Sequence, residues 1–227
     1  MPARKKMEPD LAPSSRRIDL AGPAGRLEAL LEPPVGEPAG AGVVCHPHPL
    51  HGGTMHNKVV YQAAKGLVAA RMAALRFNFR GVGRSEGVHD AGRGECQDVG
   101  AALDLLEDRF GPVPVVAAGF SFGAMVGLRT ARSRPEVAGL IAMGLPLAHD
   151  SFDFLRSETR PLLVLQGEND LYGPVSDVHA LVAGLGPAVQ FRVIPGVDHF
   201  FTGKVDTVRE IVTEFCAGIV SLPGPVS

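Results

Sequence analysis

The pentapeptide at 119–123, which reads Gly-Phe-Ser-Phe-Gly, constrains this chain more than any other feature. An apolar segment of strand length, 113–118, comes directly before it, and 124–131 follows with the apolar spacing of a helix. A Gly-x-Ser-x-Gly run between a strand and a helix is typical of the nucleophile elbow, a turn so tight that glycine is needed on both sides of the serine. The elbow would expose the hydroxyl of Ser121 beside N–H groups at the start of the next helix. The alternative is an ordinary glycine-rich turn that contains a serine by chance.

Strand-like and helix-like segments alternate along the rest of the chain. Short apolar runs typical of strands occupy residues 16–20, 26–31, 41–45, 73–79, 137–143, 161–166 and 189–194. Segments with helical spacing begin near residues 57, 92, 174 and 205. This alternation predicts an α/β fold, with a mostly parallel sheet covered by helices on both faces and an antiparallel hairpin at its N-terminal edge. We expect one domain over 14–222, preceded by a disordered tail over 1–13.

Charge and composition exclude several classes of partner. A net charge of −2 gives no electrostatic basis for binding nucleic acid or an anionic membrane. No apolar run reaches the ~18 residues of a membrane span, and the basic start is not followed by the apolar stretch of a secretory signal. The three cysteines are widely spaced and odd in number, which favours buried free thiols in a reducing compartment. We therefore expect a cytoplasmic protein.

A serine hydroxyl needs a base to accept its proton and a third group to orient that base. Asp170 follows the predicted strand at 161–166, and His199 follows the strand at 189–194. The carboxyl ends of parallel strands meet at one edge of the sheet, so both residues are expected beside Ser121. The order serine, acid, histidine is also the order expected with this elbow.

Other assignments of these residues remain open. Asp170 also fits a loop aspartate that caps the next helix, with Glu168 and Asp177 as weaker candidates for the acid. His199 also fits a surface histidine. Asp198 is disfavoured as the acid because neighbouring side chains in an extended chain point in opposite directions.

Several motifs together resemble the α/β-hydrolase superfamily, and within it the small, lidless, bacterial carboxylesterase-like and dienelactone-hydrolase-like proteins. The resemblance covers about residues 14–220 and rests on the elbow and on segments 46–58, 78–85, 167–170 and 198–199. It implies the α/β-hydrolase fold without a cap domain. It also implies Ser121 as nucleophile, Asp170 as acid and His199 as base.

In this family an oxyanion hole combines the N–H of the residue after the nucleophile, here Phe122, with an N–H from the loop after the strand at 41–46. That loop reads His-Pro-His-Pro-Leu, and proline has no N–H. His48 is therefore the first candidate for the second donor, and Leu50 is the next.

The same loop carries four histidines, at positions 46, 48, 51 and 56. A catalytic zinc site needs three protein ligands and an open position, so a metal site is an alternative. Polar packing of the histidines near a pocket is the favoured interpretation, and we predict no metal. Residues 80–85 lack the Gly-Lys-Ser/Thr ending of a phosphate-binding loop and are interpreted as a tight turn bracing the oxyanion loop.

The segment 144–160, where relatives that act on lipids insert a cap, has room for a loop and a short helix only. This favours a shallow, open pocket and short acyl chains, from acetate to hexanoate. The expected apolar wall consists of Phe152, Phe154, Phe200 and Phe201, with Leu50 and Met55 opposite.

Together these features predict a serine hydrolase that cleaves a small-molecule carboxylic acid ester through an acyl-enzyme, without a cofactor. A serine thioesterase, acyltransferase or peptidase would use the same residues, and a non-catalytic interaction protein with this fold is a further alternative. A metal hydrolase that uses the histidine loop is the least favoured. The oligomeric state has no signature in the sequence.

Overall fold

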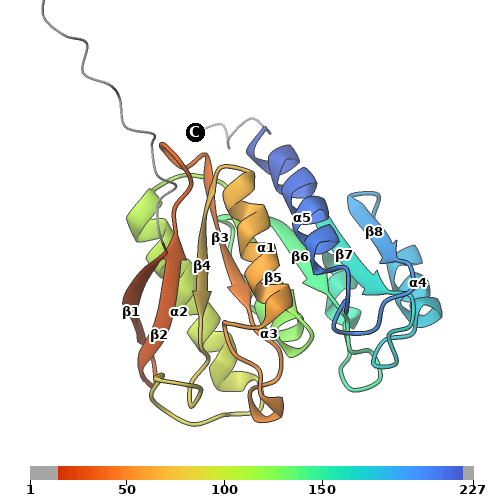
Figure 1. Ribbon diagram of the computed structural model, residues 1–227, viewed down its shortest axis with the longest axis horizontal. Coiled ribbons are helices and arrows are strands. Elements are labelled where there is room, and N and C mark those ends of the chain that lie inside the picture. Colours follow the sequence, from red (N-terminus) through yellow and green to blue (C-terminus); the bar gives the residue numbers. More distant parts are fainter. Residues whose placement is uncertain (1–14, 222–227) are drawn as a thin grey trace, which may run out of the picture.

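The computed structural model describes residues 15–221 (Figure 1). Its strands are β1 (Arg16–Gly22), β2 (Gly25–Glu32), β3 (Gly40–Cys45), β4 (Met72–Phe77), β5 (Val115–Phe120), β6 (Val137–Met143), β7 (Leu162–Gly167) and β8 (Val189–Ile194). Its α-helices are α1 (Lys58–Ala69), α2 (Arg93–Phe110), α3 (Phe122–Ala131), α4 (Val175–Ala183) and α5 (Val205–Val220). Short 3₁₀ helices cover Pro49–His51 and Asp153–Ser157. The predicted tail at 1–13 lies outside the described residues.

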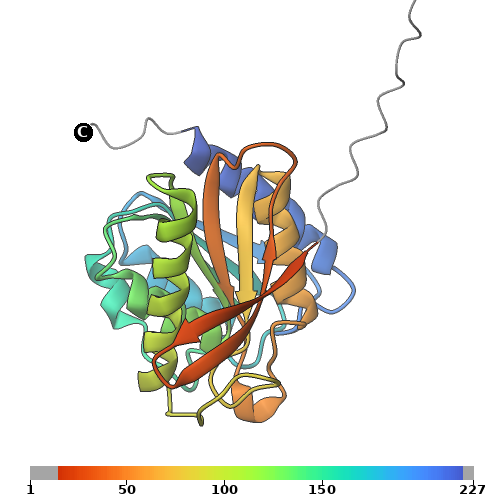
Figure 2. The same cartoon turned by 90° about the vertical axis from the view of Figure 1, so that its left-hand side faces the viewer.

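The strands form one eight-stranded sheet in the order β1-β2-β4-β3-β5-β6-β7-β8. The pairs β1–β2 and β2–β4 are antiparallel, and every other pair is parallel. The α/β class, the mostly parallel sheet and the hairpin at its N-terminal edge are therefore confirmed. The sheet twists strongly in the views of Figures 1 and 2.

Helices cover both faces of the sheet, as the alternating pattern predicts. α1 and α5 pack against each other on one face, and α2, α3 and α4 lie on the other (Figures 1 and 2). Each face has its own buried apolar cluster because most strands are apolar on both sides, as expected for a covered parallel sheet. At α2, for example, Val99, Leu103 and Leu106 recur at three-to-four spacing and are fully buried.

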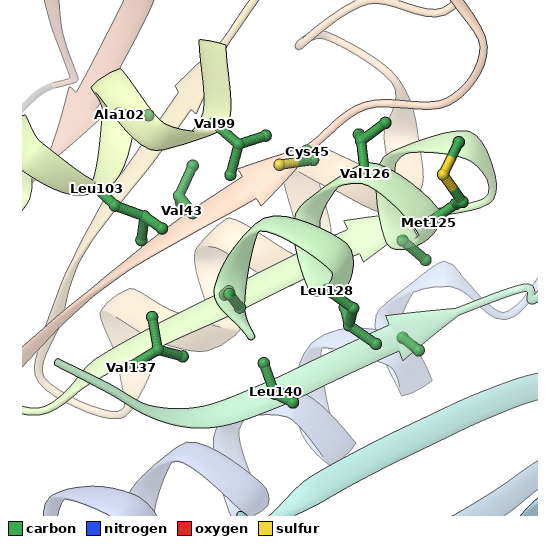
Figure 3. Packing of buried hydrophobic residues seen from close by; sticks show 14 of the residues in the cluster. Val43, Cys45, Val99, Ala102, Leu103, Met125, Val126, Leu128, Val137 and Leu140 are labelled. Atoms are coloured by element: carbon green, nitrogen blue, oxygen red, sulfur yellow. The ribbon is translucent and has the colours of Figure 1, made fainter. Parts of the chain in front are cut away.

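The core beneath the Gly-x-Ser-x-Gly turn is closely packed. Figure 3 shows Cys45 of β3 lying between Val99 of α2 and Val126 of α3, with Val43 further back along the same strand. All four side chains have no exposed surface. This packing fixes α3 against the sheet and so gives the turn before it a rigid base.

The strand that leads into the turn, β5, ends later in the sequence than predicted. β5 continues through Gly119 and Phe120 because these residues pair with Ala142 and Met143 of β6. The segment 144–160 contains only the short 3₁₀ helix, so no cap covers the sheet edge. The loops that follow β3, β4 and β7 gather along the lower edge of the molecule in Figure 1, beside the turn at Ser121.

Candidate active site

Ser121 occupies a strained turn between β5 and α3. Its backbone has φ 56° and ψ −120°, a conformation that residues other than glycine rarely adopt. A Cβ at Gly119 would lie 2.2 Å from the carbonyl oxygen of Gly123, and a Cβ at Gly123 would lie 2.4 Å from that of Cys45. Both glycines are therefore required, the first for the turn itself and the second for the close approach of β3.

Asp170 and His199 lie in contact at the same edge of the sheet. Asp170 follows β7 and His199 follows β8, and His199 Nδ1 lies 2.8 Å from Asp170 Oδ2. Both residues are almost fully buried. Asp170 also accepts hydrogen bonds from Gln166 Nε2 and from the N–H groups of Tyr172 and Gly173, at 2.7, 2.8 and 3.2 Å. Because a carboxylate only accepts, Nδ1 of His199 carries the proton and Nε2 is left with its lone pair.

Aromatic rings hold His199 in place beside the turn. The imidazole centroid lies 5.0 Å from that of Phe120, the residue before Ser121, and 4.6 Å from that of Tyr172. Gly144 is close on another side, since a Cβ there would lie 3.1 Å from Cε1 of His199. Within the part of the chain that the structure describes, no hydrogen bond joins the Ser121 hydroxyl to His199. Such bonds are often long in sites without substrate and tighten on binding.

Asp198, the alternative acid, has a different role. Its carboxylate accepts from the N–H groups of Phe200 and Thr202, each at 3.0 Å, and from the Thr202 hydroxyl at 2.9 Å. These hydrogen bonds, led by the one from the Thr202 N–H, lower the pKa of Asp198. Asp198 therefore closes the loop after β8 instead of contacting its neighbour His199.

The backbone N–H groups of Phe122 and His48 are the candidate oxyanion donors. Phe122 is the first residue of α3, so its N–H has no partner within the helix. The N–H of His48 has no acceptor among residues 15–221 either, and the His48 and Phe122 rings are 4.9 Å apart. The N–H of Leu50 is not free, because it donates to Nδ1 of His48 at 3.2 Å. Leu50 is thus the weaker candidate.

A hollow of about 370 Å³ opens next to Ser121. It is lined by His48, His51, His89, Ala91, Ser121, Phe122, Met125, Pro146, His149, Asp150 and Tyr172. Six of these residues have flat rings, and most of those rings also carry polar atoms. The surface that faces Ser121 is therefore a mixed polar and aromatic one.

The predicted wall of phenylalanines is corrected by the structure. Phe152 and Phe201 have at most 1% exposure and lie in the apolar clusters on opposite faces of the sheet, and Phe154 packs against the cluster of Phe152. Phe200 is half exposed and lines a separate hollow near the start of α5. Met55 is fully buried. Its N–H donates to the Asn78 side chain and its carbonyl accepts from the Arg76 side chain, and both of these residues lie at the end of β4. Apolar loop residues are drawn into the core wherever they can reach it.

The four loop histidines do not form a metal site. Within residues 15–221, no cluster of three or more potential ligands is suitable for a metal ion. His46 is buried, donates from Nδ1 to the Pro47 carbonyl at 2.7 Å and accepts at Nε2 from the Phe79 N–H at 3.0 Å. Burial lowers the pKa of His46 to about 4, so its ring is neutral. It ties the loop after β3 to Phe79, just after β4, and the bracing role expected of residues 80–85 stays a prediction.

Several residues around the hollow were missed by the sequence reasoning, chiefly His89, His149, Met125 and Tyr172. His89 and Tyr172 lie on loops that were expected at this edge, so their positions were a usable signal. Met125 and His149 could not be recognised from the sequence as residues that line the hollow. Which residues of a helix or loop face a hollow depends on how the elements pack.

Comparison with known proteins shows the family. The model of the alpha/beta hydrolase domain matches residues 42–215. An uncharacterised protein of Rickettsia prowazekii is 38% identical over 214 residues, 90% of each chain. An α/β serine hydrolase homologue from Coxiella burnetii is 40% identical with a TM-score of 0.83, over 88% of this chain and 96% of that one. A serine hydrolase without a lid from Xanthomonas campestris is 32% identical with a TM-score of 0.83, over 94% and 97%.

These relatives match the chain over nearly its whole length, the two solved structures share its fold, and the one from Xanthomonas campestris also has no lid. None of the helices within residues 15–221 is long and apolar enough to cross a membrane. The chain therefore belongs to the α/β-hydrolase family, among its small hydrolases without a lid.

Proposed function

We propose that this protein is a serine hydrolase of small carboxylic acid esters, with Ser121 as nucleophile, His199 as base and Asp170 as the orienting acid. The observation that carries the proposal is the 2.8 Å contact between His199 Nδ1 and the buried Asp170 carboxylate, at the sheet edge where Ser121 occupies its strained turn. The relatives described as serine hydrolases support it.

In the proposed reaction, these residues account for each proton transfer. Nε2 of His199 accepts the proton of the Ser121 hydroxyl while the oxygen attacks the ester carbonyl, and Asp170 stabilises the imidazolium that forms. The N–H groups of Phe122 and His48 stabilise the negative oxygen of the tetrahedral intermediate. His199 then returns the proton to the leaving alcohol, which yields an acyl-enzyme. Water, deprotonated by His199, releases the carboxylic acid and restores Ser121.

The hollow favours small substrates. Its volume of about 370 Å³ is at the lower end for ligand pockets, and the short segment between β6 and β7 adds no lid. Short acyl chains are therefore the proposed substrates. Besides the ester and water, the proposed reaction uses only groups of the protein. The three free cysteines fit a reducing compartment such as the cytoplasm.

Hydrolysis of p-nitrophenyl butyrate by the wild type and by Ser121→Ala tests the proposal. The variant is expected to lose several orders of magnitude in kcat, because the nucleophile is removed. Ser176→Ala, on the exposed face of α4, is the matched control and should retain activity. A fluorophosphonate probe should label Ser121 alone.

Labelling at another residue, or full activity of Ser121→Ala, contradicts the proposal. Faster turnover of thioesters or peptides than of the matched esters would keep the nucleophile and reject the ester class.

A further inference from the structure

Two histidine rings that the proposed triad does not use line the hollow next to Phe122. His48 comes from the loop after β3 and His89 from the loop after β4, and their centroids are 5.1 Å apart. Their distances from the Phe122 ring are 4.9 and 5.8 Å. Both rings therefore lie beside the residue that follows Ser121, where part of a bound substrate would rest.

The protonation of His48 is set by its own loop. Its Nδ1 accepts a hydrogen bond from the N–H of Leu50 at 3.2 Å, so the proton of the neutral ring is on Nε2. Partial burial, followed by the neighbouring rings of His51 and His89, lowers the pKa of His48. The ring is therefore neutral at physiological pH and has one N–H donor available, at Nε2.

The protonation of His89 is set by a buried carboxylate. Nδ1 of His89 lies 2.9 Å from Oε1 of Glu95, which is fully buried at the start of α2. The two Glu95 oxygens accept from the N–H groups of Asp90 and Gly92, at 2.9 and 2.8 Å, so the carboxylate is held in place. The contact with His89 is not aligned well enough to be a full hydrogen bond, but a nitrogen lone pair would repel the carboxylate at this distance. Nδ1 therefore carries the proton, and Nε2 of the neutral ring is an acceptor.

We propose that His48 and His89 form a donor–acceptor pair that binds a hydroxyl group of the substrate, which makes hydroxylated esters the preferred class. This inference rests on the proposed ester hydrolysis. With centroids 5.1 Å apart, one oxygen can lie within about 3 Å of both ring nitrogens, accepting from His48 and donating to His89.

Other polar groups fit the pair less well. A carboxylate or a carbonyl oxygen can only accept, so it would face the lone pair of His89. An anion would also approach the carboxylate of Asp150, which lines the same hollow together with His149. An ammonium group can only donate, so it would face the N–H of His48. A hydroxyl both donates and accepts, and it adds no charge.

Matched ester pairs test the inference at pH 8.5, about two units above the ordinary imidazole pKa. p-Nitrophenyl 3-hydroxybutyrate is compared with p-nitrophenyl butyrate, which places the hydroxyl in the acyl part. Ethylene glycol monobutyrate is compared with propyl butyrate, which places it in the alcohol. The wild type should favour the hydroxylated member of at least one pair about tenfold in kcat/KM.

Two variants connect that ratio to the histidine pair. His89→Phe removes the acceptor, and the ratio should fall to about one. Glu95→Ala removes the carboxylate that keeps the ring proton of His89 on Nδ1. The ratio should fall in this variant too. Arg93→Gln, at an exposed neighbouring position, is the control and should leave the ratio as in the wild type.

Equal rates within both pairs for the wild type would overturn the inference, as would a tenfold preference that survives His89→Phe and Glu95→Ala. The ratio is independent of any general loss of activity or stability in a variant. Failure to hydrolyse any of the four esters would instead count against the ester reaction itself, and the hydroxyl site would be rejected with it.

Discussion

Residues 15–221 contain two pairs of a histidine and a buried carboxylate, and they are assembled in different ways. Asp170 and His199 are 29 residues apart and meet because β7 and β8 are neighbours in the sheet. Glu95 and His89 are six residues apart and meet at the start of α2. The first pair is a well-aligned hydrogen bond, whereas the second is a close but poorly aligned contact.

The difference indicates what each pair can do. Asp170 has four hydrogen-bond donors, and His199 is enclosed by Phe120 and Tyr172, so that imidazole has one orientation. Glu95 also accepts from the N–H groups of Asp90 and Gly92, which directly precede α2, so its main structural role is to hold the start of that helix. A rigid pair suits proton transfer, which depends on geometry, while a looser pair at the pocket wall suits substrate selection.

The largest expected effect separates the two pairs directly. Asp170→Asn should lower kcat/KM for p-nitrophenyl butyrate by about 10⁴-fold, because the wrong tautomer of His199 is then favoured. Glu95→Gln should cost less than about tenfold on this ester, which has no hydroxyl for His89 to bind. Asp198→Asn, at a carboxylate that closes a loop, is a second comparison and should also cost far less than Asp170→Asn. Steady-state kinetics of the three variants measure these effects, and the reverse ranking would mean that the wrong pair is catalytic.

A glycine next to His199 tests the rigidity of the first pair. Gly144 has φ 58°, and a Cβ there would lie 2.9 Å from Phe120 and 3.1 Å from His199. Gly144→Ala should lower kcat by up to about 100-fold, since small displacements of a catalytic group are costly. Gly36→Ala, with φ 78° and no atom near the added methyl group, carries similar backbone strain without the contact and should retain activity. Similar kcat values for the two variants would show that the position of His199 is not critical.

His46 is a buried imidazole without a carboxylate partner, and its protonation should make the stability of the protein depend on pH. Its pKa in the folded state is about 4, below the value of 6.5 expected when unfolded. The unfolded state therefore binds the proton more readily, and stability is lost as the pH falls from about 6.5 towards 4. At about 1.36 kcal/mol per pKa unit, the loss between pH 7.5 and pH 5 is about 2 kcal/mol.

Urea unfolding of the wild type and of His46→Gln at the two pH values measures this contribution. The variant should be less stable at pH 7.5, because the ties to Pro47 and Phe79 are altered, but its stability should change less with pH. An equal pH dependence in the two proteins would assign the effect to other groups.

The smallest effect concerns the pocket wall next to the second pair. Each buried methylene contributes about 0.8 kcal/mol, or about fourfold in kcat/KM, until the acyl chain passes the rim of the hollow. We expect kcat/KM to be highest between acetate and hexanoate esters and to fall for longer chains, without interfacial activation. A p-nitrophenyl ester series measures this, and palmitate turnover as efficient as that of butyrate would contradict the open pocket.

Much of the architecture was predictable because its determinants are local. Apolar periodicity marks the strands and helices, and the glycines around Ser121 reflect a turn that only they allow. The choice of Asp170 over Asp198 also followed from local geometry, and the structure places Asp170, not Asp198, against His199. The catalytic roles of these residues stay a prediction that the variants above test.

The surroundings of Ser121 were less predictable because burial and hydrogen bonding are collective. Phe152 and Phe201 looked like pocket residues in the sequence but are in the core, since large apolar side chains gain most where they lose all contact with water. Leu50 looked like a possible donor, but its N–H is used by a side chain two residues away.

By itself, then, the sequence determined the order of strands and helices, the sharp turn at Ser121 and the candidates for its partners, because these depend on spacing along the chain. Only the tertiary structure decided which side chains face the hollow, which N–H groups remain free and that His48, His89 and Glu95 adjoin. Those features depend on how loops from β3 and β4 pack against α2 and α3, and no spacing within one segment encodes that packing.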